Sequence, residues 1–152
     1  MMDDLNDLYQ QVILDHSRSP RNFRALPDAN RTARGHNPLC GDNVTLYLRC
    51  EGDVIREITF QGSGCAISKS SASILTECLQ GRTKGEVEAL FERVRAMLTT
   101  GQAGGGDLGK LSVFAGVHKF PARVKCAILP WHAVLAALEG KSDPVSTEEG
   151  GA

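Results

Sequence analysis

Residues 44–60 read VTLYLRCEGDVIREITF. In its first half, apolar side chains alternate with polar ones, at Val44, Leu46, Leu48 and Cys50. A period of two is typical of a β-strand with one buried face. Gly52 and Asp53 then turn the chain into a second strand that ends at Phe60, so the stretch predicts a β-hairpin. The extended residues 32–37 are expected to add a third strand.

Helical periodicity is found on both sides of this hairpin. It predicts helices over residues 3–15, from Cys65 to about Gly81, over 87–98 and over 127–138, with a short helical turn at 108–113. The last helix is expected to begin near Cys126, because Pro130 is tolerated only in the first turn of a helix. Strands followed by helices indicate an α+β fold, with a small antiparallel sheet packed against several helices.

The length and composition of the chain fit a single domain. Of its 152 residues, 41% are hydrophobic, which is enough for one ordinary core. We expect this domain to span residues 1–140. Residues 141–152 are polar, acidic and rich in glycine at their end, so a disordered tail is predicted there.

The charge and cysteine content exclude several classes of protein. A net charge of -1 and a pI near 6.4 give no broad basic surface for nucleic acid or an anionic membrane. No apolar run is long enough to span a membrane, and the acidic N-terminus lacks the features of a signal peptide. Five cysteines are an odd number and form no dense disulfide framework. The expectation is a cytoplasmic protein with reduced thiols.

Three of the cysteines lie in polar segments marked by glycine or proline. They are Cys40, Cys65 and Cys126, and Asp42 follows the first of them by two residues. A thiolate is both a metal ligand and a nucleophile, so this group could bind zinc, build an iron–sulfur cluster or carry a sulfur atom. The chain has no CxxC pair, and the spacing leaves open both a shared metal site and three unrelated thiols.

The local surroundings of the three thiols favour reactive positions. Cys65 is expected at a helix start, where free backbone N–H groups and the helix dipole favour a thiolate. Cys126 is expected at a second helix start, with Arg123 close to it in sequence. Gly41 follows Cys40 and gives the backbone of that turn the freedom to approach a common centre.

The other cysteines and the histidines have mainly structural interpretations. Cys50 and Cys78 fall on the apolar faces of a strand and a helix, where free cysteine often behaves as a small core residue. His16 and His132 are interpreted as packing residues of helices. His36 precedes Cys40 by four residues, and a role as a base for a thiol is the functional alternative there.

Three motifs carry a resemblance to a known family. They read NPLCGD at 37–42, GSGCAIS at 62–68 and FPARVKC at 120–126. They resemble the motifs of the iron–sulfur assembly family that includes IscU, the N-terminal part of NifU, and SufU, and the match runs from about Leu5 to Gly140. This resemblance implies an α+β domain whose three cysteines and one aspartate converge at one exposed end. It also implies a cysteine desulfurase as partner.

Departures from the IscU pattern indicate which branch of the family this chain resembles. IscU-type scaffolds place a histidine before the third cysteine, where this chain has Lys125. They also carry a double-proline stretch for an Hsp70-type chaperone, where residues 120–123 read FPAR. The helical segment between Thr83 and Gly106 is longer than in that branch. All three features are similar to SufU, whose members hold zinc and accept sulfur from a SufS-type desulfurase.

The resemblance to SufU assigns roles to individual residues. It implies that Cys40, Asp42, Cys65 and Cys126 bind Zn²⁺, a metal for which four such ligands in a tetrahedral arrangement are suitable. It further implies that Cys40 accepts persulfide sulfur, with Arg123 as a supporting cation, and passes it toward a downstream iron–sulfur scaffold. The protein would then act as a sulfur carrier rather than a conventional multiple-turnover enzyme.

Two alternative functions use the same residues. In the first, the four ligands hold a [2Fe–2S] cluster or iron, as in an IscU-type scaffold. In the second, zinc only stabilises the fold and no sulfur chemistry takes place.

Overall fold

The sheet contains the predicted hairpin and the predicted third strand. A computed structural model describes residues 2–38, 41–101, 108–140 and 145–146. Within them, β1 (Arg31–Asn37), β2 (Asp42–Glu51) and β3 (Val54–Ser63) pair antiparallel. A two-residue strand, β4 (Val145–Ser146), pairs parallel with β1, so the strand order is β3-β2-β1-β4.

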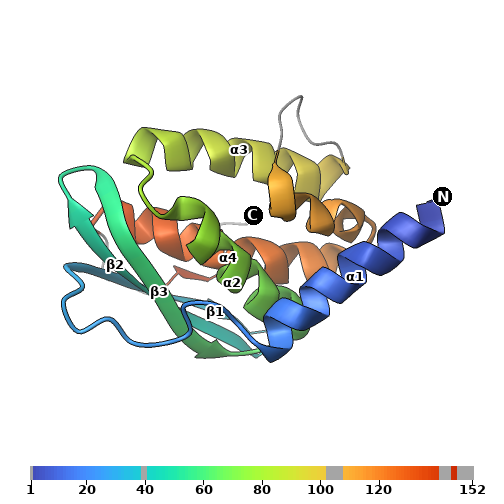
Figure 1. Ribbon diagram of the computed structural model, residues 1–152, viewed down its shortest axis with the longest axis horizontal. Helices are drawn as coiled ribbons and strands as arrows, with labels where there is room; N and C mark the ends of the chain where they lie inside the picture. The colour runs from blue at the N-terminus through green and yellow to red at the C-terminus, as the bar shows by residue number, and fades with distance from the viewer. Residues whose placement is uncertain (1, 39–40, 102–107, 141–144, 147–152) are drawn as a thin grey trace.

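Helices cover one face of this sheet (Figure 1). They are α1 (Met2–Arg18), α2 (Ala66–Leu79), α3 (Lys84–Thr100), the 3₁₀ helix η1 (Gly109–Lys119) and α4 (Pro121–Leu138). Helix α4 packs on β1 and β2, and α2 packs on β3. On the side of α4 away from the sheet lie α3 and η1, while α1 crosses α2 and η1. The predicted α+β fold is confirmed.

The core lies between the sheet and the α2–α4 layer. The inward positions of β2 follow the predicted alternation, with Leu46 and Leu48 fully buried. Leu75 of α2 and Trp131 of α4 pack against the same core and are at most 1% exposed. Because burial of each large apolar side chain contributes about 1.5–3 kcal/mol, this layer provides most of the driving force for folding.

Helix α4 begins earlier than predicted. It starts at Pro121, so Cys126 lies in its second turn and not at its start, and Pro130 lies in its interior. Proline is favoured at the first helical position, and the residue before it, Phe120, has the extended backbone that proline requires. An interior proline costs about 3 kcal/mol, and burial of side chains such as Trp131 offsets this cost. Likewise, η1 extends well beyond the predicted turn at 108–113.

A glycine determines how closely α4 approaches the sheet. A Cβ atom on Gly35 of β1 would lie 3.0 Å from Cδ1 of Leu129 and 3.2 Å from Cγ1 of Val44. The absence of a side chain at Gly35 therefore lets Leu129 pack directly on the strand. One helical turn before Leu129, Cys126 is brought to the end of β1, at Asn37.

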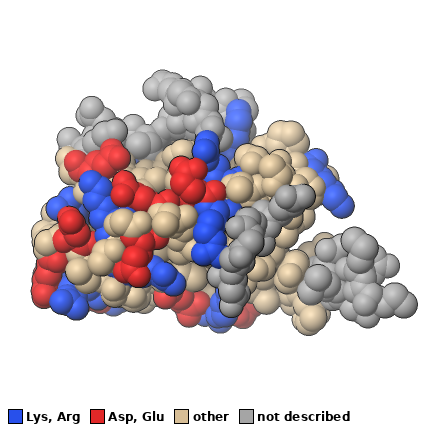
Figure 2. All heavy atoms as spheres, turned by 90° about the horizontal axis from the view of Figure 1, so that it is seen from above, with Lys and Arg blue, Asp and Glu red and all other residues tan. Residues whose placement is uncertain are grey.

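The C-terminal segment contributes one short pairing to the sheet. Val145 and Ser146 pair with Gly35 and His36 of β1. The rest of 141–152 lies outside the described residues, so disorder of that part of the tail stays a prediction. None of the described helices combines the length and the apolar character needed to cross a membrane. On the face shown in Figure 2, acidic and basic side chains are interspersed, in keeping with the net charge near zero.

Candidate metal centre

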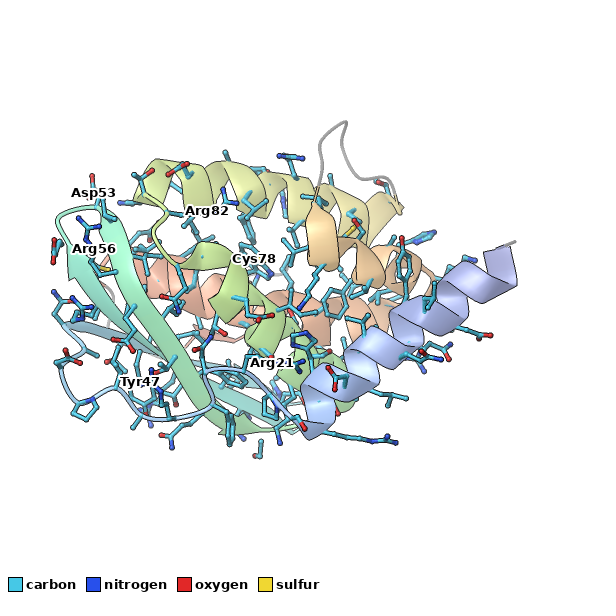
Figure 3. All side chains as sticks on the ribbon, viewed as in Figure 1. Arg21, Tyr47, Asp53, Arg56, Cys78 and Arg82 are labelled. Carbon is cyan, nitrogen blue, oxygen red and sulfur yellow. The ribbon has the colours of Figure 1, made fainter. Side chains whose placement is uncertain are left out.

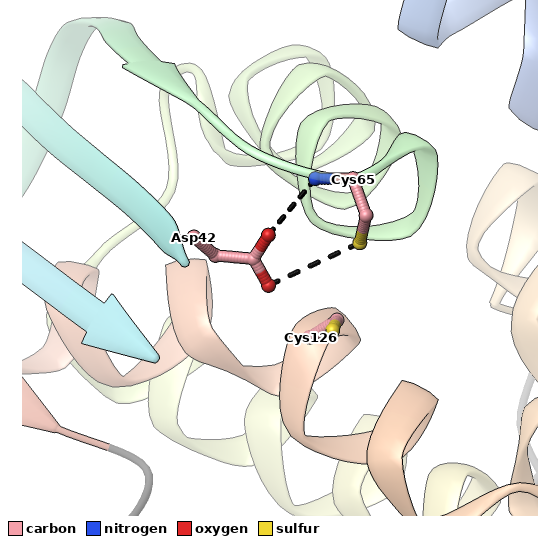
Figure 4. A group of neighbouring side chains, drawn as sticks. All are labelled: Asp42, Cys65 and Cys126. Atoms are coloured by element: carbon pink, nitrogen blue, oxygen red, sulfur yellow. Dashed lines mark hydrogen bonds between the residues drawn. The ribbon is translucent and has the colours of Figure 1, made fainter. Parts of the chain in front are cut away.

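Asp42, Cys65 and Cys126 meet at one end of the sheet (Figure 4). Asp42 is the first residue of β2, Cys65 precedes α2, and Cys126 lies on α4. One ligand atom from each of the three lies within 4.8 Å of the others. The structure thus brings together three of the four predicted ligands. The fourth, Cys40, lies outside the described residues.

Cys65 has the helix-start position that the sequence predicts. It is the N-cap of α2, and its Sγ accepts a hydrogen bond from the backbone N–H of Ser68 at 3.4 Å. The pKa of Cys65 is lowered to about 6, mainly by a hydrogen bond with Cys126, while burial opposes this shift and the Ser68 N–H adds to it. A thiol with this pKa is largely a thiolate at neutral pH, which is the form that binds metals.

Asp42 is held in place by the connection between β3 and α2. Its side chain is 1% exposed, and its Oδ1 accepts a hydrogen bond from the backbone N–H of Cys65 at 2.9 Å. Its Oδ2 lies 3.9 Å from Sγ of Cys65. Gly64 makes this approach possible, since a Cβ atom there would lie 2.4 Å from Oδ1 of Asp42.

Cys126 faces a buried amide. Its thiol is 2% exposed, and Nδ2 of Asn37 donates a hydrogen bond to its Sγ at 3.6 Å. Asn37 is the last residue of β1 and pairs with Asp42 in the β1–β2 register. Neither Asn37 nor Gly64 was among the predicted site residues. A signal for Asn37 exists in the inward positions of β1, where a polar residue follows Ala33 and Gly35.

Next to the metal centre is an open hollow of about 740 Å³. Cys65 and Cys126 form part of its wall, together with residues of α1, η1 and the start of α4. Arg123 is exposed and also lines the hollow, with its guanidinium 4.6 Å from the ring centre of Phe120. Phe120 is 49% exposed, and Leu14, on the α1 side of the hollow, is 42% exposed. The hollow therefore combines apolar surface, a cation and two candidate ligand thiols in one wall.

The other two cysteines pack as predicted. Cys50 is buried on β2, and Cys78, near the end of α2 (Figure 3), is half-buried against the core. Burial raises the pKa of both thiols, so both stay protonated and weakly nucleophilic at neutral pH. These properties fit a structural role for Cys50 and Cys78.

The histidines lie away from the ligand atoms. His16 is buried between α1 and α2, where its Nδ1 lies 2.7 Å from Oγ of Ser73. His132 packs against Phe91, with ring centres 5.6 Å apart. His36 is exposed, whereas its neighbour Asn37 is buried, so the two side chains lie on opposite faces of β1. The inward residue of that strand end is therefore Asn37, not His36.

The donor set matches the chemistry of zinc. Zinc binds cysteine sulfur and carboxylate oxygen, and the described residues place two sulfur atoms and one carboxylate within 4.8 Å of one another. The pKa of Cys65, lowered to about 6, favours its thiolate form at neutral pH. The same donors can also hold an iron–sulfur cluster, so the geometry defines a metal site without selecting one metal.

Comparison with known proteins identifies the family of this chain. The family described as the NifU-like N terminal domain matches residues 8–127. The zinc-dependent sulfurtransferase SufU of Bacillus subtilis is 36% identical over 148 residues, which cover 97% of this chain and 95% of that protein. The iron–sulfur cluster assembly scaffold protein IscU of Streptococcus pyogenes is 37% identical over 137 residues, which cover 89% of this chain and 85% of that protein.

Solved structures show the same architecture. A putative iron–sulfur cluster assembly scaffold protein for the SUF system, from Fervidobacterium islandicum, superposes with a TM-score of 0.77 at 34% identity and covers 84% of this chain and 94% of its own. The N-terminal part of a NifU-like protein from Brucella abortus has a TM-score of 0.78 at 25% identity, covering 89% and 94%. By sequence and fold, this chain belongs to the NifU-like N-terminal domain family.

Proposed function

We propose that this protein binds zinc through Cys40, Asp42, Cys65 and Cys126 and accepts persulfide sulfur from a SufS-type cysteine desulfurase for iron–sulfur cluster assembly. The observation that carries the proposal is the meeting of Asp42, Cys65 and Cys126 within 4.8 Å, beside an open hollow. The likeness to SufU over nearly the whole chain supports the same function.

Zinc in this site would stabilise the thiolates and connect three elements of the fold. Asp42, Cys65 and Cys126 come from β2, the start of α2 and α4, so one ion would link the sheet to both helices of the central layer. Zinc has no redox chemistry of its own, which protects a bound persulfide from oxidation by the metal. Binding energy at such a site adds to the stability of the fold.

Sulfur transfer requires one accessible thiolate, and we assign this role to Cys40. Cys126 is buried, and Cys65 is tied to the N-terminus of α2. In the proposed step, the Cys40 thiolate attacks the outer sulfur of the cysteine persulfide on the desulfurase. A new S–S bond forms at Cys40, the S–S bond of the partner breaks, and the electron pair leaves with the cysteine thiolate of the partner. The protein then carries the sulfur to a downstream scaffold.

The hollow beside the centre is the proposed docking place for the persulfide-bearing segment of the desulfurase. Its rim carries exposed apolar side chains, including Leu14 and Phe120, which a free protein rarely places together without a partner. Among the described residues, its basic lining side chains are Lys119 and Arg123, and these favour a segment that carries carboxylates. Arg123 would support the reaction here by attracting such a segment.

Two measurements test this function. Protein purified without oxygen should be colourless and contain about one zinc per chain, as expected for a four-ligand site. It should also stimulate a cysteine desulfurase, and mass spectrometry after the reaction should find persulfide on Cys40. Persulfide mainly on Cys50 or Cys78, or full stimulation by the Cys40→Ala variant, would contradict the proposed mechanism.

A scaffold for a [2Fe–2S] cluster is the second candidate function. The relative IscU of Streptococcus pyogenes, named as an assembly scaffold, is as similar to this chain as SufU is. A brown protein with iron in place of zinc would support this candidate. Zinc-loaded protein that leaves the turnover of the desulfurase unchanged would instead support a zinc site that only stabilises the fold.

A further inference from the structure

Asn37 is a buried polar residue beside the candidate metal centre. It has no role in the proposed sulfur transfer. Its side chain is 0% exposed, and its Oδ1 has no hydrogen-bond partner among the described residues. An apolar residue of similar size would fill the same space without burying a polar group. Packing alone therefore does not explain an amide at this position.

The amide donor of Asn37 faces sulfur. Its Nδ2 lies 3.6 Å from Sγ of Cys126, a suitable length for a hydrogen bond to sulfur, which is a larger and weaker acceptor than oxygen. The packing of α4 on β1 positions these two atoms. Gly35 and Asn37 occupy successive inward positions of β1, and Leu129 and Cys126, one helical turn apart on α4, lie over them.

The two ligand thiols that the structure describes, Cys65 and Cys126, thus each accept an N–H hydrogen bond, but from different sources. The Sγ of Cys65 accepts the backbone N–H of Ser68 at 3.4 Å, because Cys65 caps a helix. Cys126 lies within a helix, where the backbone N–H groups are directed along the helix axis. The amide of Asn37 gives Cys126 the N–H contact that the helix start gives to Cys65. An N–H···S bond stabilises the thiolate form and fixes its rotamer, which favours a stationary ligand. It also withdraws charge from the sulfur, which makes it a weaker nucleophile.

We propose that Asn37 is a positioning residue that holds Cys126 as a stationary thiolate ligand and keeps it from accepting sulfur. The part concerning sulfur rests on the function proposed above, whereas the part concerning the ligand needs only a metal in the site. The hydrogen bond from Asn37 would then keep Cys126 fixed in its buried position, so that Cys126 stays a ligand while Cys40 accepts sulfur.

The test compares Asn37→Leu with a matched control, Thr59→Val. Thr59 is also 0% exposed, and its Oγ1 also has no hydrogen-bond partner among the described residues, but it lies on β3 opposite Tyr47, roughly 17 Å along the sheet from Asp42. Asn37→Leu should release zinc to a chelator about tenfold faster, since loss of a hydrogen bond to a metal ligand typically costs 10–100-fold in affinity. In the cobalt-substituted protein, its sulfur-to-metal charge-transfer band should move to lower energy. Thr59→Val should change neither property.

Two further measurements complete the test. Persulfide mapping should find sulfur on Cys126 in Asn37→Leu and not in the wild type. In wild-type protein loaded with ¹¹³Cd, the side-chain amide protons of Asn37 should show scalar coupling to the metal across the N–H···S bond, a readout that needs no variant to fold.

The outcomes separate this inference from the proposed function. Unchanged zinc release, cobalt spectrum and persulfide map in Asn37→Leu would overturn the inference and leave the proposed function standing. Absence of the cadmium coupling in a loaded protein would overturn it as well. A wild type that binds metal but accepts no sulfur would overturn the proposed function, while the spectra would still decide the role of Asn37 toward Cys126. A wild type that binds no metal would overturn both.

Discussion

Gly64 and Asp42 are packed so closely that a side chain at position 64 would have to displace the carboxylate of Asp42. A Cβ atom on Gly64 would lie 2.4 Å from Oδ1 of Asp42 and 2.7 Å from Oγ of Ser68. The peptide N–H that follows Gly64 is the donor to Asp42, so backbone and carboxylate must approach each other directly. The glycine therefore positions a candidate ligand without containing any chemical group that could bind metal.

A first prediction follows for Gly64→Ala. The added methyl group should displace Asp42 and lower the affinity for zinc at least about tenfold, the usual effect of disturbing a residue that supports a ligand. Competition with a chromophoric chelator measures this. Gly85→Ala is the matched control, because a Cβ atom there meets nothing within 4 Å. In helix α3 it should stabilise the protein by about 0.5–1 kcal/mol and leave zinc bound. Equal affinities in the two variants would show that Asp42 tolerates the displacement.

The second prediction concerns the ligand cysteines. Cys65→Ala and Cys126→Ala should each lose stoichiometric zinc and show a lower Tm, because zinc binding contributes to the free energy of folding. Cys50→Ala removes a buried thiol of the core and should cost only about 1 kcal/mol through a small cavity, with zinc retained. Elemental analysis and thermal unfolding measure both effects. Full zinc occupancy in both ligand variants would exclude a shared site.

The third prediction is a pH dependence that arises from His16. The pKa of His16 is lowered, mainly because the side chain is buried. Arg21 and Lys110 lower it further, while Glu77 opposes the shift. The folded protein therefore keeps His16 neutral where the unfolded chain takes up a proton. This stabilising contribution is complete above the unfolded pKa of about 6.5 and is lost as the pH falls toward the lower pKa of the folded state.

Urea unfolding at roughly pH 7.5 and 5.5, on either side of the unfolded pKa, tests this prediction. The free energy of unfolding should fall more steeply with acidification in the wild type than in His16→Gln, because the variant lacks the titrating group. Taking the difference between the two proteins removes the contributions of the other groups. Identical pH slopes would mean that His16 does not couple protonation to folding.

The fourth prediction concerns the hollow and its partner. In a titration of this protein against a fixed amount of desulfurase, Phe120→Ala should raise the concentration needed for half-maximal stimulation of the desulfurase about tenfold. This is the size expected for an anchoring aromatic residue at an interface. Maximal stimulation and zinc content should be unchanged, since Phe120 contributes no ligand atom. Phe23→Ala is the matched control. Phe23 is also an exposed aromatic residue beside a cation, Lys69, but it lies against β3 outside the hollow. Equal effects of the two substitutions would argue against docking at the hollow.

Local sequence patterns were sufficient for most of the fold. The alternation from Val44 to Cys50 depends only on the period of a strand, so it predicted β2 and its buried face without knowledge of the rest of the chain. The position of Cys65 at the start of α2 was predictable for a similar reason, because the glycines before it and the periodic apolar residues after it mark a helix start. The resemblance of three short motifs then grouped the cysteines with Asp42.

Strands β1–β3 and the helices were therefore predictable from the chain alone, because they depend on residues close together in it. The candidate ligands are far apart in the chain, and the resemblance of their motifs to a known family grouped them. Tertiary packing sets the position of Cys126 in α4, since the cost of Pro130 inside a helix is offset by burial against other elements. It also decides the roles of Gly64 and Asn37, whose partners Asp42 and Cys126 are distant in the chain. Contacts of this kind arise from the packing of α4 and the β3–α2 connection against the sheet, and no local periodicity encodes them.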